Sequence, residues 1–117
     1  MIRAYATNDL DELVRIGNAA WRNIYESMRN DLGDEIFQIV NPTPDTVKGL
    51  QIIEQIKSHP EWVMICEEQC QVVGFLTYRI DGEIADICNN AVDPECGLKG
   101  IGQQIRAHYF EQEVLSN

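Results

Sequence analysis

The chain has 117 residues, 44% of them hydrophobic, and 19 acidic against 9 basic residues give it a formal net charge of −10. This length fits a single domain, and the acidic balance argues against a nucleic-acid partner, because a phosphate backbone requires a surface rich in Lys and Arg. No apolar run approaches the roughly 20 residues of a bilayer span, and the N-terminus lacks the apolar segment of a signal peptide. We therefore expect a cytoplasmic protein with no membrane partner.

The first forty residues begin with a strand and a long helix. Ile2–Ala6 has the composition of a short strand. Apolar residues then recur at spacings of three and four between Leu10 and Met28, which predicts an amphipathic helix. Thr7 or Asn8 is expected to cap this helix, and a bend or break is expected near Trp21.

Two shorter helices are predicted next. Asp34–Val40 is the first of them, and Asn41-Pro42 ends it. The second is expected to begin with Thr43 as its cap and Pro44 in its first position, where the fixed φ of proline suits a helix. This second helix ends at Ser58.

The pattern then changes to strands. Three candidates follow one another: Trp62–Cys66, Gln71–Ile80 and Glu83–Val92. A turn at residues 67–69 and a strong turn signal at Asp81-Gly82 join them as hairpins. A final helix is predicted over Gly100–Leu115, with Tyr109 on its apolar, core-facing side. The predicted order is therefore β-α-α-α-β-β-β-α.

The four cysteines are Cys66, Cys70, Cys88 and Cys96, and none of them forms a C-x-x-C pair. A zinc site requires close ligand pairs on a loop, which this spacing does not supply. We therefore expect buried reduced thiols, with neither a metal site nor a disulfide.

A glycine-rich segment follows the third of these strands. Gly97-x-x-Gly100-x-Gly102 stands between the strand and the last helix. Glycines let a phosphate approach backbone N–H groups, and the positive end of the helix dipole adds to the attraction. The segment is not a P-loop, since no Lys-Ser/Thr pair follows, and on its own it is equally compatible with an ordinary turn.

Residues 90–95, Asn-Ala-Val-Asp-Pro-Glu, together with 99–102, Lys-Gly-Ile-Gly, resemble the acetyl-coenzyme A motif of GNAT-type N-acyltransferases. The resemblance implies an α/β (α+β) fold with a mostly antiparallel sheet of about four strands and helices on both faces. It also implies that backbone groups of Ala91 and Val92 bind the pantetheine arm of acetyl-CoA. The residues implied to bind its pyrophosphate are Gly97, Leu98, Lys99, Gly100, Ile101 and Gly102.

Two departures from the family pattern stand out. Gly97 occupies the place of a Gln or Arg, and Leu98 that of a glycine, so Leu98 is strained if that place requires a positive φ. The family also continues beyond the helix with further strands and a helix that often supplies a Tyr to protonate the leaving thiolate. We therefore expect residues 1–117 to form one GNAT-like domain without these C-terminal elements, and the isolated chain to be a poor catalyst.

Catalytic candidates lie on the fourth strand of the sheet. Asp86 is the expected base toward the amine, and backbone N–H groups from Asn90 to Val92 are expected to polarise the thioester carbonyl. Asp86 equally fits a cross-strand ion pair or a solvated position. The apolar residues Trp21, Tyr25, Met28 and Phe37 either line an acceptor pocket or pack in the core.

The resemblance implies acetyl transfer from acetyl-CoA to a primary amine of a small molecule or peptide. A non-catalytic remnant that binds coenzyme A or another protein is the alternative. The strand Glu83–Val92 is expected to end the sheet, and its open edge favours a homodimer. The charges of Glu83 and Asp86 and the net charge of −10 favour a monomer instead.

Overall fold

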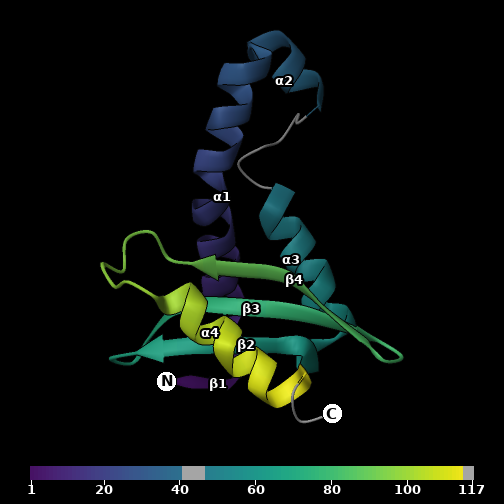
Figure 1. Cartoon of the computed structure of the whole chain (residues 1–117). Helices are drawn as coiled ribbons and strands as arrows, with labels where there is room; N and C mark the ends of the chain where they lie inside the picture. The colour runs from purple at the N-terminus through teal and green to yellow at the C-terminus, as the bar shows by residue number, and fades with distance from the viewer. Residues whose placement is uncertain (41–46, 115–117) are drawn as a thin grey trace.

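A computed structural model describes residues 1–40 and 47–114 of the chain. One antiparallel sheet contains all four of the strands, in the spatial order β1-β2-β3-β4 (Figure 1). Their bounds are β1 Ile2–Ala4, β2 Val63–Glu68, β3 Gln71–Asp81 and β4 Ile84–Val92. β4 is thus an edge strand of this sheet.

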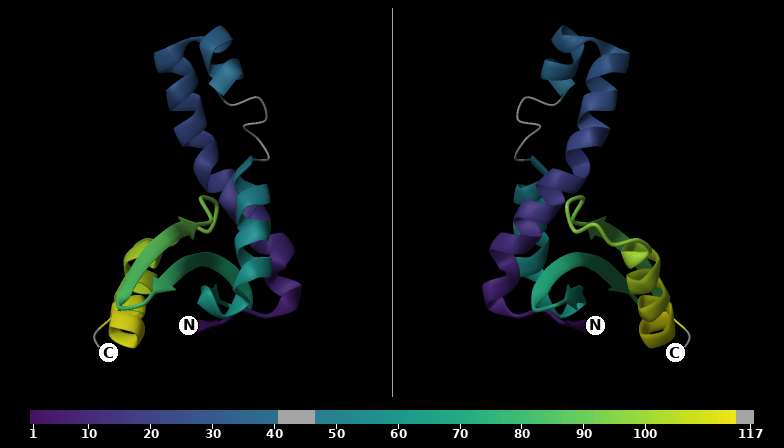
Figure 2. Two further views of the ribbon diagram at one scale, coloured as in Figure 1. Left: turned by 90° about the vertical axis from the view of Figure 1, so that its right-hand side faces the viewer. Right: turned by 90° about the vertical axis from the view of Figure 1, so that its left-hand side faces the viewer.

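Helices cover both faces of the sheet, as Figure 2 shows. α1 (Leu10–Leu32) and α3 (Val47–Ser58) pack on one face, and α4 (Ile101–Tyr109) packs on the other. α2 (Asp34–Val40) lies at the far end of α1, beyond the β4 edge (Figure 1). This arrangement confirms the predicted fold class. Within residues 1–40 and 47–114, no helix has the length and apolarity needed to cross a membrane.

The start of the long helix differs from the prediction. A 3₁₀ turn (Thr7–Asp9) precedes α1, and the Asp9 carboxylate accepts a hydrogen bond from the Ala6 N–H at 2.8 Å. The polar group at this helix start is therefore Asp9, and neither Thr7 nor Asn8 caps it. α1 runs as one helix past Trp21, so no break occurs there. The predicted cap and first residue of α3, Thr43 and Pro44, lie outside the described residues.

The first hairpin turn was also misplaced. β2 continues to Glu68, and the two-residue turn is Gln69-Cys70, with φ of 53° and 64°. Positive φ at both central residues matches the twist of a tight hairpin, but this turn lacks the Asn or Gly that would mark it in the sequence. The second hairpin turn lies one residue later than predicted: Asp81 ends β3 and pairs with Ile84, and the turn is Gly82-Glu83, with Gly82 at φ 63°.

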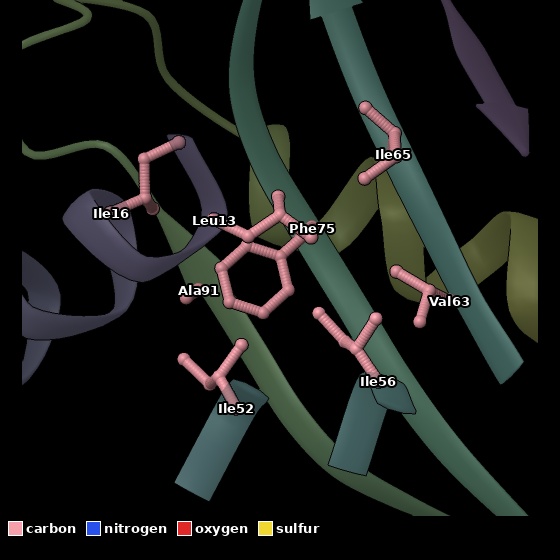
Figure 3. Packing of buried hydrophobic residues seen from close by; sticks show 8 residues of the cluster. All are labelled: Leu13, Ile16, Ile52, Ile56, Val63, Ile65, Phe75 and Ala91. Atoms are coloured by element: carbon pink, nitrogen blue, oxygen red, sulfur yellow. The ribbon is translucent and has the colours of Figure 1, made fainter. Parts of the chain in front are cut away.

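The core between the sheet and α1/α3 is centred on Phe75, which is fully buried (Figure 3). α1 and α3 approach each other closely because Gly49 has no side chain. A Cβ there would lie 2.8 Å from both Asn18 Nδ2 and Val14 Cγ1. Instead, the Gly49 N–H donates to Asn18 Oδ1 at 2.8 Å, which satisfies an N-terminal amide of α3 from α1.

The second core joins α4 to the opposite face. Ile101, Ile105 and Tyr109 are its buried helical residues, which confirms the core position of Tyr109. The helix approaches β3 at Gly74, where a Cβ would lie 3.0 Å from the Ala91 carbonyl oxygen and 3.1 Å from Ile101 Cγ2. A residue at this place other than glycine would therefore push α4 away from the sheet.

We expect the stability of the chain to fall in acid through Asp9. The Arg3 guanidinium forms two hydrogen bonds to its carboxylate, at 2.8 and 2.9 Å, and with the Ala6 N–H it holds the pKa of Asp9 below its usual value against the opposing effect of burial. A lowered folded-state pKa stabilises the fold above the unfolded value of about 3.9, and this stabilisation disappears as the pH falls further. Denaturant titrations from pH 7 to 2 check this.

Asp9→Asn is the matched variant for that titration. It should lose about 1–3 kcal/mol at pH 7, because Arg3 loses one of its two charged partners and keeps only Glu67, and it should show a flatter acid limb than the wild type. Identical pH profiles for the two proteins would contradict the assignment.

Candidate functional site

β4 carries an extra residue near its middle. Thr77 pairs with Asn89 and Tyr78 pairs with Ile87, so Cys88 has no partner on β3. Such a bulge bends a strand and commonly lies beside a functional site. Here it separates the exposed hairpin end of β4 from the half that leads to the glycine-rich loop.

The last residues of β4 present backbone groups to its open edge. The Asp93 N–H donates to the Val73 carbonyl oxygen at 2.8 Å, so the backbone of Asp93 faces β3. Backbone direction alternates along an antiparallel strand, and the N–H groups of Val92 and Asn90 therefore point to the free edge, whereas that of Ala91 points toward β3. The edge amides at the end of β4 are available to a ligand.

The turn after β4 is firmly tied to the fold. The Cys96 N–H donates to the Asp93 carbonyl oxygen at 3.2 Å, and Asp93 Oδ1 accepts from the Glu95 N–H at 3.0 Å. Arg15 of α1 donates to Asp93 Oδ2 at 3.0 Å. Burial raises the pKa of Asp93, but the hydrogen bonds from Glu95 and Arg15 together lower it by more than burial raises it. The pKa of Asp93 therefore lies below its usual value. Asp93 therefore anchors the loop as a carboxylate.

The glycines of the loop adopt the backbone that glycine favours. Gly97 and Gly100 have φ of 73° and 77°, and a Cβ at either place would meet no atom within 4 Å. Leu98 is not among the residues with positive φ, so the expected strain at Leu98 is absent. The loop therefore places its two left-handed residues at glycines and leaves open space above both.

The N–H groups of residues 97–103 find no hydrogen-bond acceptor in the described part of the chain. The first hydrogen bond of α4 is that of the Gln104 N–H to the Gly100 carbonyl oxygen, at 3.0 Å. The amides of Ile101, Gly102 and Gln103 thus form the open end of the helix, where the dipole is positive. A loop and helix start of this kind fit a bound anion such as a phosphate group.

Asn90 fixes the helix start against β4. Its Nδ2 donates to the Gly102 carbonyl oxygen at 3.1 Å. The predicted catalytic residue Asn90 thus has a structural contact through its side chain and an open backbone amide at the strand edge. The predicted coenzyme residues from Ala91 to Gly102 lie together in this strand, loop and helix start.

Gly100→Ala and Gly102→Ala should change stability in opposite directions. Alanine at Gly100 must adopt φ 77° and should cost about 1–2 kcal/mol. Gly102 lies inside α4 without a positive φ, and its added Cβ would lie 3.5 Å from Val92 Cγ2, an ordinary contact. Gly102→Ala should therefore stabilise the fold by up to about 1 kcal/mol. Urea unfolding of both variants measures the two changes; a loss at Gly102 equal to that at Gly100 would contradict the assigned backbone.

No protein-family model and no curated protein matches the sequence. Solved structures do match. PaiA N-acetyltransferase from Thermoplasma acidophilum, in complex with coenzyme A, has a TM-score of 0.63 at 18% identity over 95% of this chain and 69% of its own. A GNAT family acetyltransferase from Brucella melitensis, in complex with acetyl-CoA, has a TM-score of 0.64 at 17% identity over 96% and 66%.

The chain has the GNAT fold. N-acetylglutamate synthase from Neisseria gonorrhoeae, complexed with coenzyme A and N-acetyl-glutamate, shares it at a TM-score of 0.61 and 16% identity, over 95% of this chain and 22% of its own. Among these three GNAT-fold structures the chain spans from 22% to 69% of the neighbour's length.

A hollow of about 350 Å³ lies on the α1/α3 side of the GNAT sheet, between α3 and the β3–β4 hairpin. Its lining residues are Gln51, Glu54, Gln55, Ser58, His59, Trp62, Arg79 and Cys88. Beneath it, Asn89 Nδ2 donates to Gln55 Oε1 at 2.8 Å and to Thr77 Oγ1 at 2.7 Å. The buried Asn89 Oδ1 accepts no hydrogen bond from the described residues.

The other predicted site residues are spread over the GNAT fold. Asp86 is exposed and pairs with Arg79 across the hairpin at 3.4 Å, which is the ion-pair alternative for this residue. Phe37 is buried against the Arg29 guanidinium, 4.9 Å from its ring centroid, so it packs rather than lining a pocket. Trp21 is half-buried beneath Lys48.

The prediction that the cysteines are buried is wrong for two of them. Cys66 is buried and all four cysteines are free, but Cys70 and Cys88 are exposed because one lies in the hairpin turn and the other on the bulge. No group of three or more His, Cys, Asp or Glu side chains that could hold a metal ion occurs in residues 1–40 and 47–114.

Sequence reasoning missed the bulge at Cys88, the Arg15–Asp93 link and the position of Lys48. Each depends on residues far apart in the chain, and no local pattern marks it.

Proposed function

We propose that the chain is a GNAT-like domain that binds acetyl-CoA and transfers its acetyl group to a primary amine. The observation that supports this most is the run of N–H groups from residue 97 to 103, at the start of α4, which find no acceptor among the described residues. The diphosphate of coenzyme A is an anion of suitable size for such a run. GNAT-fold neighbours with coenzyme A or acetyl-CoA bound add support.

The binding residues divide by the part of the coenzyme that they meet. The amides around Gly97, Gly100 and Ile101 would hold the pyrophosphate, and the exposed Lys99 would add positive charge there. The pantetheine arm would run along the end of β4, where the outward N–H and carbonyl groups of Val92 can bond to its amides. Ala91 would support that strand from the core, where its side chain is buried.

The chemistry requires an oxyanion site and a base from the protein. The amine attacks the thioester carbonyl, a C–N bond forms, the C–S bond breaks, and the proton lost by the amine balances the proton gained by the thiolate. The outward N–H groups of Asn90 and Val92 would stabilise the oxyanion. Asp86 would accept the amine proton on its Oδ1, directly or through water, while its Oδ2 keeps the contact with Arg79.

Calorimetric titration with coenzyme A and acetyl-CoA tests binding, and release of free thiol in the presence of a panel of amines tests transfer. We expect binding with a Kd in the micromolar range. Binding without thiol release would favour the alternative of a non-catalytic coenzyme-binding domain. Absence of binding would refute the proposed function.

We further propose a homodimer formed through the hairpin half of the β4 edge, on the other side of the Cys88 bulge from the edge amides of Asn90 and Val92. The edge is flanked by exposed apolar residues, of which Ile84 is 61% exposed and Ile80 36%. Ile80 and Ile84 lie in the β3–β4 hairpin itself, whereas the exposed Phe110 lies after the end of α4. Unpaired strand edges readily bind a second strand.

Ile84→Lys should convert this dimer to a monomer, because a charged residue on an edge strand opposes pairing. Leu50→Lys is the matched control, since Leu50 is equally exposed at 61% but lies on α3. Sedimentation at micromolar concentration distinguishes the species. A wild-type protein that is monomeric throughout, or a dimer unaffected by Ile84→Lys, would rule out this interface.

A further inference from the structure

Lys48 is a half-buried cation that forms no ion pair with an acidic side chain of residues 1–40 and 47–114. Its Nζ lies 4.4 Å from the centroid of the Trp21 ring. Burial lowers the pKa of Lys48, and the only other group that affects it is Cys88; no carboxylate of the described residues contributes. In a chain with 19 acidic residues this isolation is unusual, because a partly buried ammonium ordinarily acquires a carboxylate.

Lys48 lies one helical turn before a residue of the hollow that borders the β4 bulge. Gln51, that residue of α3, lines the same hollow as Cys88, the bulged residue of β4, and Asn90 is two residues further along the strand, about 7 Å at the usual rise. α1 and α3 cross the sheet on the face opposite α4 (Figure 2). Lys48 therefore approaches the β4 edge from the face away from the coenzyme loop.

The groups around Lys48 suit an anion with a single negative charge. The Trp21 ring contacts the Lys48 ammonium from one side. Gln51, one turn further along α3, has its amide on the same face of the helix. Arg79, the cation that borders the neighbouring hollow, already pairs with Asp86. A phosphate dianion ordinarily requires several amides or a guanidinium, whereas one ammonium with one amide suits a carboxylate.

We propose that Lys48 binds a carboxylate of the acceptor, so that the acceptor is an amino acid or a similar amine that also carries a carboxylate. This inference rests on the proposed acetyl transfer. The acidic surface of the chain attracts the ammonium end of such an acceptor, and Lys48 supplies a positive charge for its carboxylate. The adjoining hollow between α3 and the hairpin has room for a side chain.

Paired probes that differ only in the carboxylate test this. The pairs are alanine with ethylamine, leucine with 3-methylbutylamine, and phenylalanine with 2-phenylethylamine. With coenzyme A present, we expect at least one amino acid to bind about tenfold or more tightly than its partner amine. NMR of the Lys48 ε-carbon should show its pKa rising on addition of the amino acid but not of the amine.

Variants separate a binding role from a packing role. Lys48→Met keeps the contact with Trp21 and should abolish the preference for the amino acid, whereas Lys48→Arg should retain most of it. Lys57→Met, at an exposed position in the last turn of the same helix, should leave the preference unchanged. Equal binding within all three pairs, or a preference that survives Lys48→Met, would overturn the inference.

The same titrations distinguish this inference from the proposed function. If coenzyme A binds but no pair shows a carboxylate preference, the role of Lys48 is wrong and acetyl transfer stands. If coenzyme A does not bind, the proposed function fails, and the ε-carbon titration without coenzyme still decides whether Lys48 binds a carboxylate.

Discussion

Gly100→Asp should weaken the binding of coenzyme A by about 10- to 100-fold. Gly100 precedes the first residue of α4 at φ 77°, and a side chain there would point into open space beside the unpaired N–H groups. The added carboxylate would occupy the region where the pyrophosphate is proposed to bind, and like charges a few ångströms apart in a partly dried site repel strongly. Calorimetric titration gives the two dissociation constants.

Gly100→Asn is the matched control for this prediction. Asn and Asp have nearly the same size, and both tolerate the left-handed backbone better than other residues with side chains. The two variants therefore share any cost of the side chain and differ in charge. Asn should lose much less affinity than Asp, and the difference should shrink as salt is raised. Equal losses, or no loss with Asp, would mean that the phosphates bind elsewhere.

Phe75→Ala should cost about 3–5 kcal/mol, a large share of the stability of a small domain. Phe75 is fully buried between β3 and the two helices, with Leu13 and Ile52 among its neighbours in the cluster (Figure 3). Its removal would leave a cavity where strands and helices from both halves of the chain meet. Urea unfolding followed by circular dichroism measures the loss.

Phe110→Ala is the control, because Phe110 is 43% exposed. It should change the free energy of unfolding by less than about 1 kcal/mol. If Phe75→Ala fails to fold, Phe75→Leu should fold with a smaller loss, since it keeps most of the apolar volume. A Phe75→Ala protein as stable as Phe110→Ala would show that the core is not centred on this residue.

Local patterns in the sequence predicted most of the fold. Asp34–Val40 was placed within its observed bounds, since a proline follows it closely, and the Gly82 turn was placed to within one residue because glycine takes the positive φ that a tight hairpin needs. The Gln69-Cys70 turn was misplaced, because there the tertiary pairing of β2 with β3 imposes the same backbone on residues that do not favour it.

The candidate site was predictable to the same extent. The glycine spacing located the loop whose glycines take a positive φ, since its geometry depends on the backbone within a few residues. The bulge at Cys88 depends on the register between β3 and β4, and the surroundings of Lys48 depend on the packing of α1 against α3. No short sequence pattern predicts such contacts between distant segments. Asp86 was singled out for its place on the strand, but its contact with Arg79 depends on the register of the hairpin.

The two hydrophobic clusters lie on opposite faces of the sheet and share only its strands. Free-energy changes at sites more than about 7–10 Å apart with no common contacts usually add. Substitutions on the apolar face of α4 should therefore combine independently with those on the apolar faces of α1 and α3. Substitutions at the Arg15–Asp93 hydrogen bond should not, because this contact ties α1 to the turn before the glycine loop. A lineage with this architecture can alter the face that carries Lys48 by small steps while the glycine loop stays constant. Selection can therefore change residues on one face of the sheet without altering the free energy that residues on the other face contribute.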